Sequence, residues 1–304
     1  MTFKDFLLSA ISAVIVFSAS RGAAQNPPPA PAPPPTPRTP KTAAPIDITG
    51  NWVAVITEDW RWRMLTPPKG DYASVPLNDE GRRVADSWNL AKDEAAGLAC
   101  KPYGIGNIMR MPGRMRITWQ DDTTLKLEFD AGTQTRLLHF GAAASAASKK
   151  PEKPGAPSWQ GYSAAEWQVA GQTMTLDRNG IPQFGPNPGG GGGGGGRAGR
   201  GGGRGGPGGP PRGGSLFVTT TNFRDGYLRK NGVPYSANAN ITEYFDRVGP
   251  EPNGDVILLV RTVVEDPKYL QLPFITSTHF KLEKDASKWN PSPCKIDPPV
   301  EPGK

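Results

Sequence analysis

Apolar and polar residues alternate along the middle of the chain, and short turns interrupt the alternation. In RMRITWQ (114–120), Met115, Ile117 and Trp119 alternate with charged or polar residues, and TLKLEFD (124–130) and QTRLLHF (134–140) repeat the pattern. Because successive side chains of a strand point to opposite faces, this period of two predicts an antiparallel meander with one buried and one solvated face.

Further segments combine β-branched and aromatic residues with flanking glycine, proline or asparagine. They are IDITGNWVAVIT (46–57), GYSAAEWQVAG (161–171), SLFVTTTNF (215–223), NANITEYFDRV (238–248), DVILLVRTVVED (255–266) and FITSTHFKLEK (274–284). Many short strands are typical of a sandwich or an up-and-down barrel, and a closed barrel leaves no exposed edge strand. We therefore predict a mainly β chain that forms an antiparallel up-and-down barrel.

One stretch has a helical pattern instead. Asn78 is a favourable N-cap, and Asp79 and Glu80 suit the first turn of a helix because its N-terminus carries partial positive charge. The pattern predicts one short helical segment near residues 78–99.

The N-terminal residues have the three-part pattern of a secretory signal peptide. Lys4 precedes an apolar run from Phe6 to Phe17, and small residues precede a cleavage site after Ala24. The apolar run is too short to span a bilayer as a helix. The pattern predicts a secreted or periplasmic protein with no membrane span in its mature form.

Proline and glycine divide the rest of the chain. Residues 26–45 are rich in proline, which disfavours both helices and sheet ladders. The predicted organisation is a signal peptide (1–24), a disordered proline-rich linker (25–45), one barrel domain (46–298) interrupted by disordered loops at 141–157 and 186–214, and a tail (299–304).

The formal net charge of +7 has a local origin. The signal peptide, the linker and the four arginines of the glycine-rich loop account for the whole excess, so the predicted barrel is neutral. Arginine–glycine tracts occur in RNA-binding arms, but this tract lies between two strands of a neutral, exported domain. We interpret it as an expanded loop, which is entropically inexpensive, and expect no nucleic-acid partner.

Cys100 and Cys294 are the only cysteines. In an oxidising compartment one pairing is available to them, and we predict a disulfide bond; two free thiols are the alternative. The two histidines and unassigned carboxylates are too few to indicate a metal site, and no phosphate-loop or dinucleotide fingerprint is present. We expect no cofactor.

Three groups of aromatic residues lie close to arginine or to one another. Flat rings beside guanidinium groups could line a pocket for a sugar or an apolar molecule, although aromatic residues also fill β cores by default. The candidate ligand residues are Trp60, Arg61, Trp62, Arg63, Tyr162, Trp167, Tyr227 and Arg229.

The triplet Gly50-Asn51-Trp52 resembles the G-x-W motif that opens the lipocalin and calycin barrels. The resemblance implies structural roles for Gly50 and Trp52: the tryptophan would close one barrel end and pack against a basic residue from near the end of the barrel. Arg261 is the best candidate for that partner.

A longer resemblance is to a family of secreted bacterial proteins without an established activity. It rests on PSWQGYSAAEW (157–167), NFRDGYLRKNGVPYS (222–236) and the segment from ITEYFDRV to VEDPKYLQLPF (241–274). The chain departs from the family at Tyr162, where the family has histidine. The resemblance implies secretion and a β architecture.

These observations predict non-catalytic binding of a small apolar or carbohydrate-like molecule. Two alternatives stay open. One is a hydrolase or lyase that uses carboxylates or tyrosine at the barrel mouth, although Asp266-Pro267 also fits the start of a turn. The other is a surface protein that acts through its proline- and glycine-rich segments.

Overall fold

The computed structural model describes residues 38–141, 155–169, 172–176, 182–186 and 213–300. The predicted signal peptide and glycine tract lie outside these residues, as do 25–37, 142–154 and 301–304.

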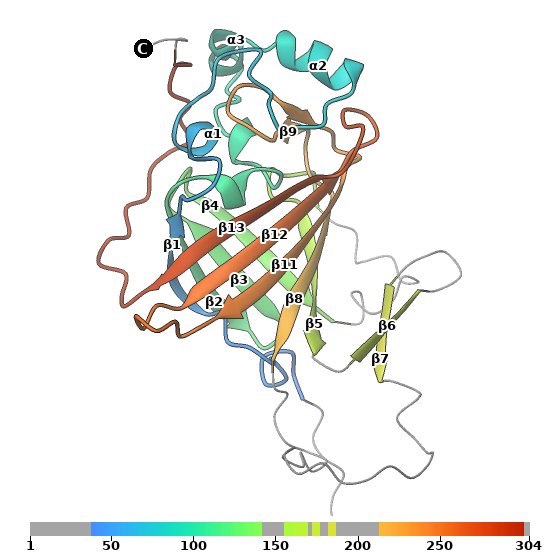
Figure 1. Ribbon diagram of the computed structural model, residues 1–304, viewed down its shortest axis with the longest axis vertical. Coiled ribbons are helices and arrows are strands. Elements are labelled where there is room, and N and C mark those ends of the chain that lie inside the picture. The colour runs from blue at the N-terminus through green and yellow to red at the C-terminus, as the bar shows by residue number, and fades with distance from the viewer. Residues whose placement is uncertain (1–37, 142–154, 170–171, 177–181, 187–212, 301–304) are drawn as a thin grey trace, which may run out of the picture. The chain divides into compact units, whose positions relative to one another are not determined.

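Nine strands close into a barrel, which confirms the fold predicted from the alternation of apolar and polar residues (Figure 1). Their order around the barrel is β1-β13-β12-β11-β8-β5-β4-β3-β2. The strands are β1 (Gly50–Val55), β2 (Arg114–Asp121), β3 (Thr124–Phe129), β4 (Gln134–Phe140), β5 (Tyr162–Val169), β8 (Gly214–Thr221), β11 (Asn240–Val248), β12 (Ile257–Glu265) and β13 (Phe274–Glu283).

One neighbouring pair departs from the antiparallel pattern. Strands β4 and β5 run parallel, with Leu138 opposite Ser163, while the other barrel pairs are antiparallel. The reason is geometric: strand direction cannot alternate all the way round a closed ring with an odd number of strands. A parallel pair cannot be joined by a tight hairpin, and the chain accordingly has 21 residues, 141–161, between β4 and β5.

The barrel interior is filled by the apolar side chains of the alternating pattern. Met115, Leu127 and Phe280 are among its buried residues, and Trp52 is fully buried. The Trp52 indole Nε1–H donates to the carbonyl oxygen of Ile48 at 3.0 Å.

The predicted contact between Trp52 and Arg261 is not formed. Along β12, Val260 and Thr262 point into the barrel, so Arg261 between them points outward. Its guanidinium lies over the ring of Tyr244, 4.5 Å from the centroid, on the outer face. The strand alternation itself therefore excludes Arg261 as the partner of Trp52.

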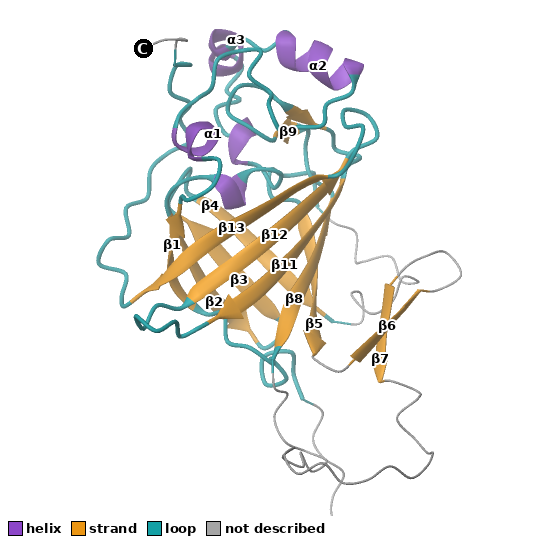
Figure 2. Ribbon diagram, viewed as in Figure 1, coloured by secondary structure: helices purple, strands orange, loops and turns teal. Residues whose placement is uncertain are grey.

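Two long connections form a layer over one end of the barrel, which we call the cap (Figure 2). The cap comprises residues 56–113, between β1 and β2, and 222–239, between β8 and β11. It provides most of a second apolar cluster, which includes Tyr72, Leu228 and Tyr235 and extends to Phe274, the first residue of β13. Its elements are α1 (Trp60–Met64), α2 (Asp79–Asp86), α3 (Leu90–Ala95), the 3-10 turns η1 (Lys101–Tyr103) and η2 (Ile108–Arg110), and the two-residue strands β9 (Gly226–Tyr227) and β10 (Pro234–Tyr235).

The helical segment predicted near 78–99 is present as two helices, α2 and α3. Asn78 caps α2 by accepting from the Gly81 amide at 2.8 Å, and Asn89 caps α3 by accepting from the Lys92 amide at 3.0 Å. The second cap is the reason the segment divides, because Asn89 has extended backbone angles. No helix of the described residues is long and apolar enough to cross a membrane.

The disulfide between Cys100 and Cys294 is formed, as predicted. It joins the cap to the C-terminal segment, which leaves β13 and runs back toward the cap (Figure 1). The Ser292 amide donates to the Asp130 carbonyl at 2.9 Å, and the Val300 amide donates to the Thr66 carbonyl at 3.0 Å. A separate two-stranded sheet is formed by β6 (Gln172–Leu176) and β7 (Pro182–Pro186).

Candidate functional site

The predicted ligand residues fall into three places rather than one. Trp167 points into the barrel near the end of β5, whereas Tyr162 points outward from β5 and stacks on His139 with ring centroids 4.8 Å apart. The remaining six lie in the cap: Trp60, Arg61, Trp62, Arg63, Tyr227 and Arg229.

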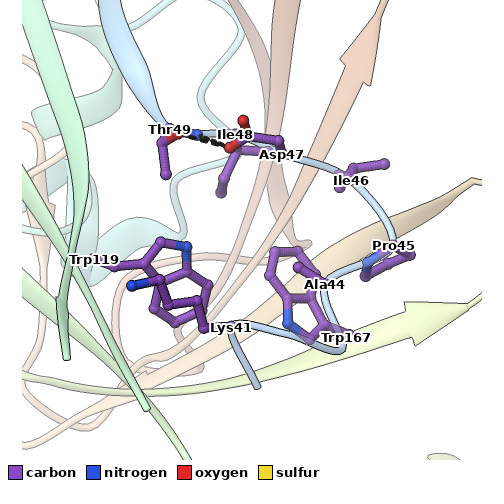
Figure 3. A pocket seen from close by; sticks show the side chains of 9 residues that line it. All are labelled: Lys41, Ala44, Pro45, Ile46, Asp47, Ile48, Thr49, Trp119 and Trp167. Carbon is purple, nitrogen blue, oxygen red and sulfur yellow. Dashed lines mark hydrogen bonds between the residues drawn. The ribbon is translucent and has the colours of Figure 1, made fainter. Parts of the chain in front are cut away.

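A pocket of about 360 Å³ lies at the barrel end opposite the cap (Figure 3). We call it the tryptophan pocket. Two indoles line it, those of Trp119 and Trp167, and the segment that leads into β1 provides the other lining residues. These are Lys41, Ala44, Pro45, Ile46, Asp47, Ile48 and Thr49.

Strand periodicity brings the two tryptophans together. Trp119 and Trp167 each lie two residues before the last residue of their strand. Because β2 and β5 point in the same direction along the barrel, both tryptophans lie at the same end of it. The Phe140 ring packs against both, with centroids 5.5 Å from Trp119 and 5.3 Å from Trp167. Both indoles are half-buried, so each keeps part of its surface open to solvent.

Hydrogen bonds fix the opposite wall. The Trp167 Nε1–H donates to the Pro40 carbonyl at 2.8 Å, and Arg247 donates to the Asp47 carbonyl at 2.7 Å. The Asp47 carboxylate accepts from the amide and the hydroxyl of Thr49, at 2.9 and 2.7 Å (Figure 3). The exposed Lys41 ammonium and the Thr49 hydroxyl give the pocket polar groups beside its aromatic wall.

The sequence pointed to Trp167 but not to the rest of this pocket. The alternating pattern places Trp119 on the buried face of a strand, and the proline-rich composition places residues 40–45 in the linker. The signal that could have found the site is that both tryptophans lie on the inward face at the same distance from their strand ends.

A second pocket, of about 250 Å³, lies in the cap beside Trp88, Lys101 and Tyr227. The Asp93 carboxylate accepts from the Tyr227 hydroxyl at 2.8 Å and from the Trp88 indole at 3.1 Å. Burial, reinforced by Asp93, raises the pKa of Tyr227 well above its usual range. Tyr227 therefore stays protonated and acts as a hydrogen-bond donor, which disfavours a role as a general base.

The cap also brings the half-buried Trp62 together with three buried arginines, Arg63, Arg110 and Arg229. The Arg229 guanidinium lies over the Trp62 ring, 4.5 Å from its centroid. Arg63 donates from Nε to the Arg110 carbonyl at 3.1 Å and pairs with Glu58 at 3.1 Å. Trp60 is 59 % exposed and does not share this burial. Residues 60–63 all lie in the short helix α1.

The predicted turn at Asp266 is confirmed. Its buried carboxylate accepts from the amide and the hydroxyl of Ser236, and its carbonyl accepts from the amides of Tyr269 and Leu270. Across the described ranges, no group of three or more His, Cys, Asp or Glu side chains is arranged to hold a metal ion.

Comparison with known proteins adds no assignment: no protein-family model, curated protein or solved structure matches the chain.

Proposed function

We propose that the chain is a secreted or periplasmic barrel protein that binds a small apolar or carbohydrate-like molecule, without catalysis, in the tryptophan pocket. The observation that carries the proposal is the pair of half-buried indoles, Trp119 and Trp167, on one wall of a pocket of about 360 Å³. Ligand pockets commonly have volumes of about 300–1,000 Å³ and combine aromatic walls with a few polar groups.

The chemistry of the lining supports a neutral ligand. Indole faces pack against apolar groups and against the apolar faces of sugar rings, while Lys41 and Thr49 offer hydrogen bonds at the rim. Asp47 is already engaged by Thr49, so its carboxylate is held as a fixed acceptor and orienting group.

The proposal includes export and a lipocalin-like barrel. The N-terminal sequence pattern and the Cys100–Cys294 disulfide support export. The buried Trp52 supports the lipocalin-like barrel, as does Gly50, whose φ of +138° and close approach to Leu282 require glycine. The nine strands and the outward-facing Arg261 are departures from that pattern.

The test is a binding measurement with two neutral probes, N-phenyl-1-naphthylamine for apolar ligands and maltotriose for carbohydrates. We expect at least one probe to bind saturably to the purified protein, and Trp119→Leu to weaken that binding about fivefold or more, since a stacked ring contributes about 1–3 kcal/mol.

Trp289→Leu is the matched control. The Trp289 ring lies beneath the Arg116 guanidinium, 4.6 Å from the ring centroid, and does not line the pocket. The control variant should bind like the wild type. Absence of saturable binding of either probe, or equal affinity of the wild type and Trp119→Leu, would contradict the proposal.

A further inference from the structure

The hairpin of β9 and β10 is buried along its whole length, including its charged tip. Every residue from 226 to 236 is buried, and Arg229 at the tip is 1 % exposed. The tip is enclosed by the end of α1 and the chain that follows it: Lys230 Nζ donates to the Met64 carbonyl at 3.4 Å, and Asn231 donates to the Pro68 and Asp71 carbonyls. Charged residues are rarely buried so completely without a partner.

Arg229 has no such partner. Its Nε, Nη1 and Nη2 are all buried and form no hydrogen bond with any described residue. A guanidinium carries five N–H donors in a planar fork, so burying all of them unsatisfied is costly unless something else accepts from them. The Trp62 ring covers the guanidinium and contributes a cation–π contact only.

The neighbouring carboxylates are already engaged. Asp59 pairs with Arg110 at 2.9 Å, and Asp71 pairs with Arg61. Burial, followed by the charge of Arg110, lowers the pKa of Arg229 to about 10. Asp59 and Asp71 raise this pKa through their charges, without a hydrogen bond to Arg229. Arg229 is therefore charged at neutral pH and uncompensated.

The ionised side chains around Arg229 carry one positive charge more than negative charges; Lys230, on which Asp297 acts instead, is not counted among them. They are four arginines, Arg61, Arg63, Arg110 and Arg229, and three carboxylates, Glu58, Asp59 and Asp71. A single negative charge beside Arg229 would balance the group.

We propose that the Arg229 guanidinium beneath Trp62 is a binding site for the carboxylate of a small organic acid. A carboxylate matches the planar fork of arginine with two parallel hydrogen bonds and supplies the one missing charge. The apolar part of the ligand would lie along α1, where Trp60 and Met64 are 59 % and 50 % exposed. Because Arg229 is covered, the Trp62 ring moves aside when the ligand enters.

This site is separate from the tryptophan pocket. Trp62 and Arg229 belong to the cap, whereas Trp119 and Trp167 lie at the other end of the barrel. Carboxylate binding at Arg229 and ligand binding in the tryptophan pocket can therefore be tested independently, and a negative result for one does not affect the other.

The test is isothermal titration of the purified protein with sodium benzoate, in buffers matched with sodium chloride for ionic strength. We expect a saturable heat, a change in tryptophan fluorescence that is absent in Trp62→Phe, and a loss of benzoate affinity of about tenfold or more in Arg229→Met. Arg224→Met is the matched control. Arg224 also stacks on a tryptophan, Trp159 at 4.1 Å, but it is exposed, so its loss should leave benzoate binding unchanged.

Two further probes define the ligand class. Benzyl alcohol, which has the ring but no charge, should not compete with benzoate, and inorganic phosphate should bind more weakly than benzoate because it has no apolar part to lie along α1. The proposal is overturned if benzoate gives no saturable heat beyond chloride, if Arg229→Met binds like the wild type, or if either further probe equals benzoate. Should Arg229→Met not fold, Arg229→Lys keeps the charge without the fork; unchanged affinity in that variant also overturns the proposal.

Discussion

The guanidinium of Arg136 on β4 forms a fully buried ion pair with the carboxylate of Glu243 on β11, two strands that are separated by β5 and β8 in the barrel. Ser163 and Thr220, from the two intervening strands, each accept a hydrogen bond from Arg136 at 2.9 Å and lie 2.9 Å from each other. The four side chains therefore link four neighbouring strands through the barrel interior.

Removing one member of this pair should be strongly destabilising. Glu243→Gln leaves the Arg136 charge buried without a counter-charge, and we expect the free energy of unfolding to fall by about 3–5 kcal/mol. Urea denaturation of the wild type and the variant measures the difference.

The control is a pair on the outside of the barrel. Lys281 and Asp255 are 2.8 Å apart with 46 % and 27 % of their side chains exposed. Lys281→Gln should cost only about 0–1 kcal/mol, because water screens an exposed pair. A loss for Glu243→Gln as small as that of the control would show that the buried pair is not required.

Two glycines with nearly identical φ angles test the burial of the hairpin tip. Gly232 has φ +82° and a Cβ there would lie 2.2 Å from the Trp88 ring, whereas Gly254 has φ +83° and open space around it. Gly254→Ala should cost about 1–2 kcal/mol for its left-handed backbone alone. Gly232→Ala should cost more than about 4 kcal/mol in urea denaturation, since the clash adds to the same backbone cost. Equal losses would mean that the tip is not packed.

Alkaline pH should reveal the burial of Tyr72. Burial, followed by the hydrogen bond to Asp86, raises the pKa of Tyr72 to about 12. A raised pKa in the folded state means that the folded protein holds the proton while the unfolded chain loses it near pH 10. The contribution of Tyr72 to the free energy of unfolding is therefore fully present below about pH 10 and is lost as the pH rises toward 12.

Tyr72→Phe removes this contribution. The free energy of unfolding, measured with urea at several pH values between 10 and 12, should therefore fall less steeply with pH in the variant than in the wild type. Parallel slopes would contradict the assignment.

The sequence was most informative where one local rule decides the structure. The alternation around Met115 and Ile117 predicted strands because inward and outward positions have different polarity. Asn78 predicted a helix start because its side chain can satisfy a free amide. Cys100 and Cys294 had one available partner each.

The rest depends on contacts between distant parts of the chain. Nothing near Arg229 in the sequence indicates that residues 60–72 will cover it, and a basic tip would ordinarily be expected on the surface. The resemblance to the G-x-W motif indicates Arg261 as the partner of Trp52, but the alternation of side chains along β12 directs Arg261 outward. One wall of the tryptophan pocket is formed by the residues before β1, and their proline-rich composition predicts a linker instead.

The most direct test of the proposed function is the indole region of the proton–nitrogen NMR spectrum, in which each of the eight tryptophans gives one N–H signal. Trp119→Phe and Trp167→Phe assign the two signals of the pocket. On addition of a bound probe, N-phenyl-1-naphthylamine or maltotriose, we predict that these two signals shift together and saturate at the same concentration, while the Trp62 and Trp289 signals do not move. Shifts confined to other tryptophans, or no shift of either pocket signal, would contradict a ligand site between Trp119 and Trp167.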